Sequence, residues 1–345
     1  MQWNRPFAKL YRDGRGARAA DEALEPKLPY PDGWFCLAMS AEIKPGAKLT
    51  RQLMGEDLVL VRTASGRLSA LRAYCPHLGA HLGISGVVER EEIRCNFHNL
   101  SFDLNGGACL RTTDGCPPPK ASLTGYPVME TGGAVFVWRS RKAAEPEWEL
   151  PDLPAKGWRE PAWHRFDMAS HPQQIMENVF DSHHIAQLHG VTQHPPNITF
   201  DDTRVTLEFV TDWPLIAGKV LSLPASATVY GMSMLLLHFD LPRPRLKFRV
   251  MVLPTPIAPW RIHVRVVTTV TQPALPRMLR PLEHWTAQLI QQLALLVNVN
   301  DFNADLATLH YQEYQAQPRL VAADQYIGKY RKWAERFYEI PEGLR

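Results

Sequence analysis

Two short segments of this chain carry side chains that bind transition metals. Cys75 and His77 are separated by one residue and Cys95 and His98 by two, with seventeen residues between the pairs. Two thiolates and two imidazoles can hold a two-iron, two-sulfide cluster, with the cysteines on one iron and the histidines on the other. Such a cluster transfers single electrons, so the pattern predicts a redox protein.

Ligand spacing and flanking glycines distinguish this cluster, the Rieske type, from a structural zinc site. Zinc also binds four nitrogen and sulfur ligands, but usually through C-x2-C pairs. Glycine lets the backbone approach a cluster and donate N–H bonds to its sulfurs. Glycines follow both segments, at Gly79, Gly83, Gly86, Gly106 and Gly107. We therefore expect a [2Fe–2S] cluster, a group that small electron carriers also contain.

Length and composition limit the class of protein. The 345 residues can form two domains of ordinary size, and 45% of them are apolar. A net charge of +3 without a basic run argues against nucleic-acid binding and allows an acidic electron-donor protein. There is no signal-peptide pattern, and the apolar-rich stretch 289–299 is too short for a transmembrane segment. The other cysteines, Cys36, Cys109 and Cys116, fit reduced thiols in a cytoplasmic protein.

The first half of the chain is expected to form an N-terminal arm, residues 1–32, and then a small all-β domain, residues 33–145. Short β-branched and apolar runs alternate with turns in this domain, and Asp57–Arg62, Arg67–Arg72 and Ala134–Trp138 fit strands. Both metal-binding segments fall between such strands. The cluster is therefore expected at one end of the β domain.

The second half, residues 146–345, mixes helical and strand patterns, which predicts an α+β domain with helices on an antiparallel sheet. A polar, proline-containing stretch near 140–160 indicates the boundary between the two halves. The expected strands are Arg204–Val210, Ser226–Leu241, Leu246–Leu253 and Trp260–Thr271, and the expected helices are Pro172–Leu188, Leu275–Tyr314 and Gln325–Tyr338.

A second set of potential metal ligands lies in the first of these helices. Glu177, Asp181 and His184 are spaced to share one face of a continuous helix, and His189 follows just before Gly190, where the helix can end. Two histidines and one carboxylate form the triad of non-haem Fe(II) oxygenases. Several histidines on a helix can also be a solvated face, but their occurrence beside the first motif favours a second metal site.

Together the two motifs resemble those of the catalytic α-subunit of Rieske non-haem iron oxygenases. The pattern C-x-H-x17-C-x2-H matches at Cys75–His98, and E/N-x3-D-x2-H-x4-H matches at Glu177–His189. The likeness runs from about Gly33 to the C-terminus and is nearest to ketosteroid 9α-hydroxylase and aminopyrrolnitrin-type arylamine oxygenases. It implies a Rieske domain, a helix-grip-like catalytic domain and a homotrimer. In that trimer the cluster of one subunit faces the mononuclear iron of its neighbour.

The resemblance implies which residues hold the catalytic iron. His184 and His189 would be ligands, and an acid of the late helix would complete the set. Asp305 fits the family's pattern better than Asp301, which stays as the alternative. His183 breaks the spacing and is not expected to bind the metal.

Three further residues are given supporting roles by the same resemblance. Asp181 would be a catalytic residue between the two metals, accepting hydrogen bonds from an iron-bound imidazole and from a cluster histidine across the subunit interface. Glu177 and Asn178 would support the iron ligands from the surrounding layer of residues.

The implied reaction is O2-dependent oxidation of a small apolar molecule, steroid-like or aromatic. Electrons from NAD(P)H would pass through a reductase or ferredoxin to the [2Fe–2S] cluster and then to mononuclear Fe(II). Monooxygenation is the first expectation, while demethylation, desaturation and N-oxygenation use the same kind of centre. A Rieske electron carrier without oxygenase activity is the alternative from another class. The expected core or cavity residues are Trp213, Leu215, Ile216, Met232, Met234, Leu236, Phe239 and Phe248.

Overall fold

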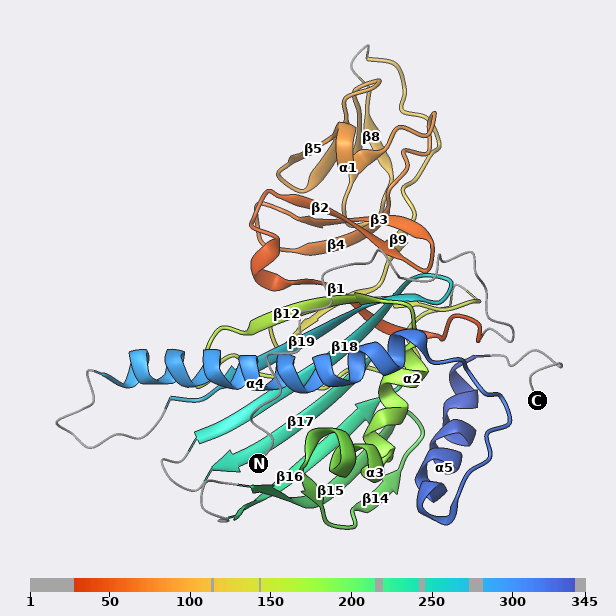
Figure 1. Ribbon diagram of the computed structural model, residues 1–345. Coiled ribbons are helices and arrows are strands. Elements are labelled where there is room, and N and C mark those ends of the chain that lie inside the picture. The colour runs from red at the N-terminus through yellow and green to blue at the C-terminus, as the bar shows by residue number, and fades with distance from the viewer. Residues whose placement is uncertain are drawn as a thin grey trace. The chain divides into compact units, whose positions relative to one another are not determined.

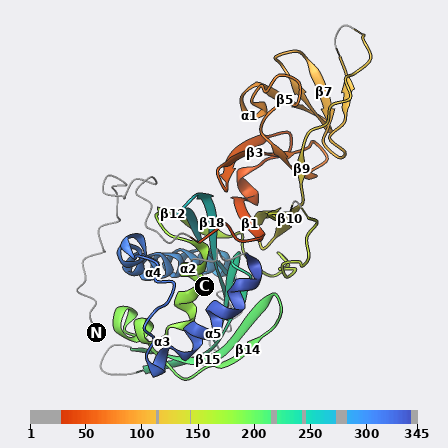
Figure 2. The ribbon, with the colours of Figure 1, turned by 90° about the vertical axis from the view of Figure 1, so that its right-hand side faces the viewer.

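The chain forms two compact units in a computed structural model that describes residues 28–112, 115–142, 144–214, 220–241, 246–272 and 282–338. One unit is Trp34–Asp152, and the other holds the described residues 28–33 and those from Leu153 to residue 338. Figures 1 and 2 show the elements of each unit from two sides. Most of the expected N-terminal arm, residues 1–27, lies outside the described residues.

The regular secondary structure of the unit Trp34–Asp152 is almost entirely short strands, which form three sheets. Their strand orders are β1-β11-β10, β2-β3-β4-β9 and β5-β6-β7-β8. The strands expected before and after the turn at Gly66 are confirmed as β3 and β4, and the one after Gly133 as β11. The bounds are β1 (Gly33–Met39), β2 (Lys48–Leu53), β3 (Glu56–Arg62), β4 (Leu68–Arg72), α1 (Leu82–Ser85), β5 (Gly86–Glu89), β6 (Glu92–Cys95), β7 (Leu100–Asp103), β8 (Cys109–Arg111), β9 (Gly125–Tyr126), β10 (Val128–Thr131) and β11 (Ala134–Arg139), with a 3-10 turn, η2, at Ser40–Glu42.

Strand β3 belongs to both hydrophobic cores of this unit. Successive side chains of a strand point to opposite faces of the sheet. Leu58 and Leu60 pack in the core that β1 and β11 share, while Val59 and Val61 pack in the core that contains the two motif cysteines. All four side chains are buried. The strand thus connects the base of the unit to the part that carries the first metal-binding motif.

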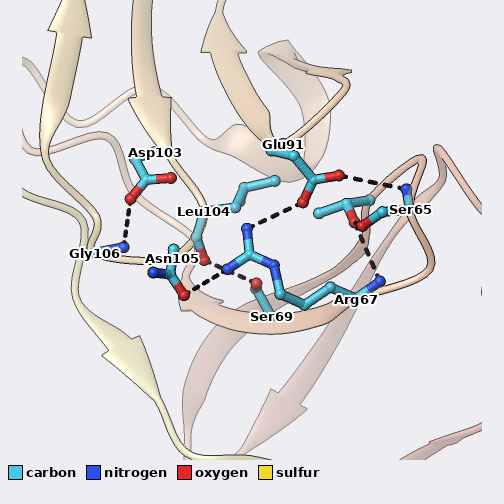
Figure 3. Close-up of polar contacts among 9 residues, drawn as sticks. Ser65, Arg67, Ser69, Glu91, Asp103, Leu104, Asn105 and Gly106 are labelled. Atoms are coloured by element: carbon cyan, nitrogen blue, oxygen red, sulfur yellow. Dashed lines mark hydrogen bonds and ion pairs between the residues drawn. The ribbon is translucent and has the colours of Figure 1, made fainter.

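A polar network around Arg67 ties the turn before β4 to two turns of the β5–β8 sheet (Figure 3). The Arg67 guanidinium donates to Asn105 Oδ1 at 2.7 Å and to Glu91 Oε2 at 3.2 Å. Ser69 Oγ donates to the backbone oxygen of Leu104 at 2.9 Å. These contacts add to the apolar core in holding the two sheets together.

The second unit is built on an eight-stranded antiparallel sheet, with strand order β12-β19-β18-β17-β16-β15-β13 and β14 also paired to β15. Helix α4 (Glu283–Tyr311) packs against β12 and β19, where Phe302, Leu306 and Leu309 join the sheet's apolar side chains. The predicted α+β fold, with an all-β first part and helices on an antiparallel sheet, is confirmed. The strands are β12 (Ala162–Met168), β13 (Thr192–Gln193), β14 (Asn197–Phe200), β15 (Arg204–Pro214), β16 (Val220–Tyr230), β17 (Met234–Leu241), β18 (Leu246–Ala258) and β19 (Arg261–Val270).

Two elements of this unit differ from those expected from the sequence. The single strand expected at Ser226–Leu241 is wrong, because β16 ends at Tyr230 and the chain turns at Gly231, whose φ is +51°, before β17. Glycine tolerates that backbone conformation without steric cost. The expected helix Pro172–Leu188 is interrupted, as described below. Strand β12 was not expected.

The last two helices expected in the second unit are present as α4 and α5. Helix α4 spans Glu283–Tyr311, and the expected start at residues 275–281 lies outside the described residues. The final helix is shorter than expected and ends in a 3-10 turn. The bounds are α2 (Pro172–Glu177), η3 (Asn178–Phe180), α3 (Ser182–His184), η4 (Ile185–His189), η7 (Ala322–Asp324), α5 (Gln325–Ala334) and η8 (Glu335–Phe337). Among the helices described here, none combines the length and apolarity that crossing a bilayer requires.

Candidate active site

The four residues of the first motif lie on two neighbouring loops of the β5–β8 region. Cys75 follows β4 in a loop closed by the bridge between Tyr74 and His81, and Cys95 ends β6. The loops are built tightly, since Cys75 N–H donates to the backbone oxygen of Ala80 at 2.9 Å. Both motif cysteines are buried. The sequence pairs separated by seventeen residues are thus brought to one end of the unit.

The cysteines and histidines of this motif face different surroundings. Burial is the main cause that raises the pKa of the Cys75 thiol to about 11; a backbone hydrogen bond with His77 opposes the rise, and the neighbouring Cys95 contributes to it. Bound iron would reverse this effect, because a coordinating thiol is deprotonated by the metal's charge. His77 and His98 are exposed, with ring centroids 4.7 Å apart. Two adjacent buried thiols and two adjacent exposed imidazoles fit the donor set of a Rieske cluster.

The second motif lies on a helical segment that is broken in the middle. Helix α2 ends at Glu177 and a 3-10 turn follows, but Asp181 has φ −104° and ψ 87° and begins α3 as its N-cap. The shared helix face expected for Glu177, Asp181 and His184 is therefore wrong. The segment then ends as expected, at Gly190 with φ +68°. The break occurs because the Asp181 carboxylate accepts the backbone N–H of residues 183 and 184.

His184, His189 and Asp305 form one cluster in the second unit. One potential ligand atom from each lies within 4.8 Å of the others. His189 Nε2 is 3.2 Å from Asp305 Oδ1, and the two imidazole rings are 5.4 Å apart at an angle of 78°. Two imidazoles and a carboxylate suit Fe(II) and leave coordination positions open. These residues fit a mononuclear iron.

Asp301 lies one helical turn before Asp305 and lines the same cavity without joining the three-residue cluster. Burial raises the pKa of the Asp301 carboxyl to about 6; His189 opposes this shift and Asp305 adds to it. The geometry thus separates the two acids that the sequence left as alternatives. Asp305 is the one within reach of both histidines.

The Asp181 backbone determines which ring nitrogen of His184 is available. His184 Nδ1 lies 2.6 Å from the carbonyl oxygen of Asp181, which can only accept a hydrogen bond. Nδ1 must therefore carry the proton, and Nε2 keeps the lone pair that a metal requires. His183 donates its backbone N–H to Asp181, and its side chain is exposed and outside the cluster, as expected.

The two remaining predicted residues have different surroundings. Glu177 is not among the cavity-lining residues, and its carboxylate accepts two hydrogen bonds from Arg331, both 2.7 Å long. Asn178 lines the cavity that also contains His184 and Asp305. Arg331 was missed by sequence reasoning, because it lies on a distant helix and belongs to no motif.

A cavity of about 230 Å³ opens beside the His184, His189 and Asp305 cluster. Alternate residues of the strands line it: Leu235, Leu237 and Phe239 of β17 do so, while Met234 and Leu236 are buried elsewhere. Its apolar lining is Ile175, Val179, Ile185, Val191, Phe209, Ala227, Leu235, Leu237, Phe239, Val250, Val252, Val266, Phe302 and Leu309. Asn178, Gln193, Thr211, Trp213 and Asn298 supply its uncharged polar groups.

Most of the described residues that were expected in the core or on a cavity wall lie in one of these two places. Trp213 and Phe239 line the cavity, and Phe248 does not. Met232, Met234 and Leu236 are buried and not among the lining residues. Residues 215 and 216 lie outside the described residues. The valines of β18 and β19 were missed, although their period-2 pattern places every second one on the cavity side.

Comparison with known proteins identifies both parts of the chain. Residues 33–127 match the Rieske [2Fe-2S] domain, and residues 137–338, more than half of the chain, match the 3-ketosteroid 9alpha-hydroxylase C-terminal domain. The chain is 28% identical to a cholesterol 7-desaturase of Ciona intestinalis, over 90% of this chain and 69% of the relative. It is 30% identical to a probable 3-ketosteroid-9-alpha-monooxygenase, oxygenase component, of Rhodococcus rhodochrous, over 50% of this chain and 44% of the relative.

Solved structures show the same fold. The structure of Pseudomonas putida CBB5 NdmA with caffeine aligns with a TM-score of 0.68 and 19% identity, covering 88% of this chain and 89% of that one.

The fold and the two sites define an oxidoreductase of the Rieske oxygenase type, with a [2Fe–2S] cluster and a mononuclear iron as its cofactors. The resemblance predicted from the two motifs is confirmed. The chain belongs to the family of the 3-ketosteroid 9alpha-hydroxylase C-terminal domain.

Proposed function

We propose that this chain is the oxygenase component of a multicomponent monooxygenase that hydroxylates an uncharged, largely apolar ring-containing molecule. The observation that carries the proposal is the position of the His184, His189 and Asp305 cluster on the wall of an apolar cavity. A metal centre that only relayed electrons would have no need of a cavity beside it. The electron-carrier alternative is disfavoured for that reason.

The proposed iron ligands are His184, His189 and Asp305, and the proposed cluster ligands are the residues of the first motif. When bound, the mononuclear iron would activate O2, and the [2Fe–2S] cluster would supply electrons. The chain's own contribution is to fix the tautomer of His184 through the Asp181 carbonyl, and to keep water from the reacting centre with the apolar cavity wall.

The cavity lining supports an uncharged substrate. Among the described residues that line it, the ionisable side chains are His184, His189, Asp301 and Asp305, and none is lysine or arginine. A carboxylate or phosphate would therefore enter without a cationic partner, at a large desolvation cost. The amides of Asn178 and Asn298 can orient one or two polar groups of a neutral molecule. The names of the relatives point to steroids and sterols as the first molecules to test.

Desaturation is the second candidate reaction. It is favoured by the relatives named cholesterol 7-desaturase, one of which aligns over 90% of this chain. Hydroxylation and desaturation can use the same iron ligands. They differ in the change to the substrate, because hydroxylation transfers an oxygen atom to it and desaturation removes hydrogen from it. Product mass distinguishes them, because hydroxylation adds one oxygen atom and desaturation removes two hydrogens.

Three further features are proposed on the family resemblance. A ferredoxin or reductase would supply electrons from NAD(P)H, the chain would form a homotrimer, and it would work in the cytoplasm. The exposed His77 and His98 rings support a cluster that reaches a partner. The Asp181 side chain is 30% exposed, which allows the expected contact with a neighbour's histidine. Light scattering of the purified protein tests the trimer.

The test of the proposed function combines metal analysis with turnover. The protein should contain about three Fe per chain, two in the cluster and one mononuclear. His189→Ala should keep the red-brown cluster and lose about one Fe together with all product. Wild-type protein, reconstituted with a ferredoxin and reductase and given a panel of neutral steroids, should yield a product with one added oxygen. A protein that holds only two Fe and has no turnover would contradict the proposal.

A further inference from the structure

We infer that Arg331, on α5, is a positioning residue for the mononuclear iron and acts through Glu177. The inference rests on the proposed function, because it takes His184, His189 and Asp305 as the iron ligands. Helix α5 lies beside α2 in the same unit (Figure 1).

Arg331 makes a two-pronged ion pair with Glu177. Its Nε and Nη2 donate to the two carboxylate oxygens, each at 2.7 Å. The side chains are 17% and 13% exposed, so the pair is largely withdrawn from water. Such a planar, bidentate contact fixes orientation as well as distance, which a single flexible ion pair does not.

The same guanidinium also holds the chain that follows the Asp305 helix. Arg331 Nη1 donates to the backbone oxygen of Gln315 at 2.6 Å, and the guanidinium lies 5.0 Å from the ring centre of Tyr314. Tyr314 and Gln315 follow α4, which carries Asp305. One side chain therefore bonds both to the segment that leads to the histidines and to the segment that leaves the carboxylate ligand.

A neighbouring contact strengthens this hold. Tyr330 is fully buried and stacks on Phe180, with ring centroids 4.6 Å apart and planes 18° apart. Phe180 directly precedes Asp181. Two consecutive residues of α5 thus contact the two ends of the Glu177–Phe180 turn.

The break at Asp181 explains why such support is needed. A continuous helix would transmit the position of α2 to His184 through its hydrogen bonds, but the backbone leaves the helical conformation at Asp181. The ligand-bearing turns α3 and η4 are short, and most of their residues are at least partly exposed. Their position is therefore not set by α2 alone. Helix α5 holds Phe180, the residue before Asp181, and the Asp181 carbonyl oxygen lies 2.6 Å from His184 Nδ1.

Removal of the Arg331 guanidinium should weaken the iron site without removing any ligand. Arg331→Met keeps much of the side-chain volume, leaves Glu177 without its partner and should weaken Fe(II) binding about 10–100-fold, as loss of an outer support does in other metal sites. Arg331→Lys keeps the charge but not the fork, and should give an intermediate loss.

The measurement is titration of the iron-depleted protein with Fe(II) alone, monitored by the electron paramagnetic resonance spectrum of the nitric oxide adduct. Arg336→Met is the matched control, because Arg336 lies five residues further along and pairs with Asp202, whose side chain is 98% exposed. We expect a weaker affinity and a broadened spectrum for Arg331→Met, and wild-type values for Arg336→Met. Wild-type affinity and spectrum in Arg331→Met would overturn the inference.

Two further variants keep the test decisive. If Arg331→Met does not fold, the double variant Glu177→Met/Arg331→Met removes both charges, a replacement that buried ion pairs often tolerate. It should fold, keep the visible spectrum of the [2Fe–2S] cluster and still bind Fe(II) weakly; normal binding would refute the positioning role. His189→Ala tests the proposed ligand set separately, because unchanged Fe(II) binding in that variant contradicts the ligand set and not the role of Arg331.

Discussion

His184 Nδ1 and the backbone carbonyl oxygen of Asp181 lie 2.6 Å apart. The side-chain carboxylate of the same Asp181 caps α3, because it accepts the backbone N–H groups of residues 183 and 184. Asp181 therefore orients a proposed iron ligand with its main chain and begins the ligand-bearing turn with its side chain.

The Asp181 carboxylate can be removed while its carbonyl is kept. Asp181→Ala should retain the cluster and the mononuclear iron, because the backbone contact to His184 persists, but turnover should fall about 10–100-fold. Iron content and steady-state rates measure the two effects. His183→Ala is the control, since that neighbouring side chain is exposed. Normal turnover in Asp181→Ala would show that the carboxylate is not part of the electron path.

The two acids of α4 should respond differently to the same change. Asp305→Asn should lose most of the mononuclear iron, leaving about two Fe per chain, because a neutral amide is a poor ligand for Fe(II). Asp301→Asn should keep about three Fe per chain, because Asp301 lies outside the cluster of ligand atoms. Elemental analysis of both variants decides the assignment. The reverse result would make Asp301 the ligand.

Acid should destabilise the second unit through His171. Burial lowers the pKa of this imidazole to about 4, while its hydrogen bond to the Pro29 carbonyl opposes the shift. In the unfolded chain the His171 imidazole has a pKa near 6.5 and binds a proton that it does not bind in the folded protein. The free energy of unfolding therefore falls as pH falls from about 6.5 towards 4.

The size of this effect can be measured by a substitution. His171 contributes at most about 1.4 kcal/mol of lost stability per pH unit in that range. His171→Asn keeps a residue suited to the N-cap of α2 and should flatten the pH dependence of the melting temperature. Parallel pH curves for the two proteins would exclude His171 as a cause of acid lability.

Filling the cavity should discriminate among substrates by size. Leu237→Trp adds bulk to the cavity wall, so KM should rise about tenfold or more for a steroid-sized substrate and less for a single-ring one. Leu236→Met on the same strand is the control, because Leu236 is buried away from the cavity. Equal KM changes for large and small substrates would argue that substrate binds elsewhere.

The sequence was most informative where chemistry is local. Ligand spacing, together with the family pattern that it resembles, pointed to Cys75, Cys95, His184 and His189 as candidate ligands, because metal ligands are constrained by short loops and helix ends. The break at Asp181 was not predictable from helical periodicity, since a capping carboxylate competes with the helix only in its actual geometry.

Contacts between segments that are far apart in the sequence also could not be predicted from sequence patterns. Glu177 carries a motif position, yet its partner Arg331 lies 154 residues away. Which residues line the cavity depends on which alternate side chains of β17 point to it. That alternation could not be assigned from the sequence, because the turn at Gly231, after which β17 begins, was not predicted.

Strand β3 has a consequence for how the first unit unfolds. Its side chains alternate between the core beneath the metal-binding loops and the core shared with β1 and β11. Local opening of either core would pull the same strand out of the other, so the two halves should exchange their amide hydrogens as one cooperative block. The loops that carry the cluster ligands are therefore expected to open only together with both cores.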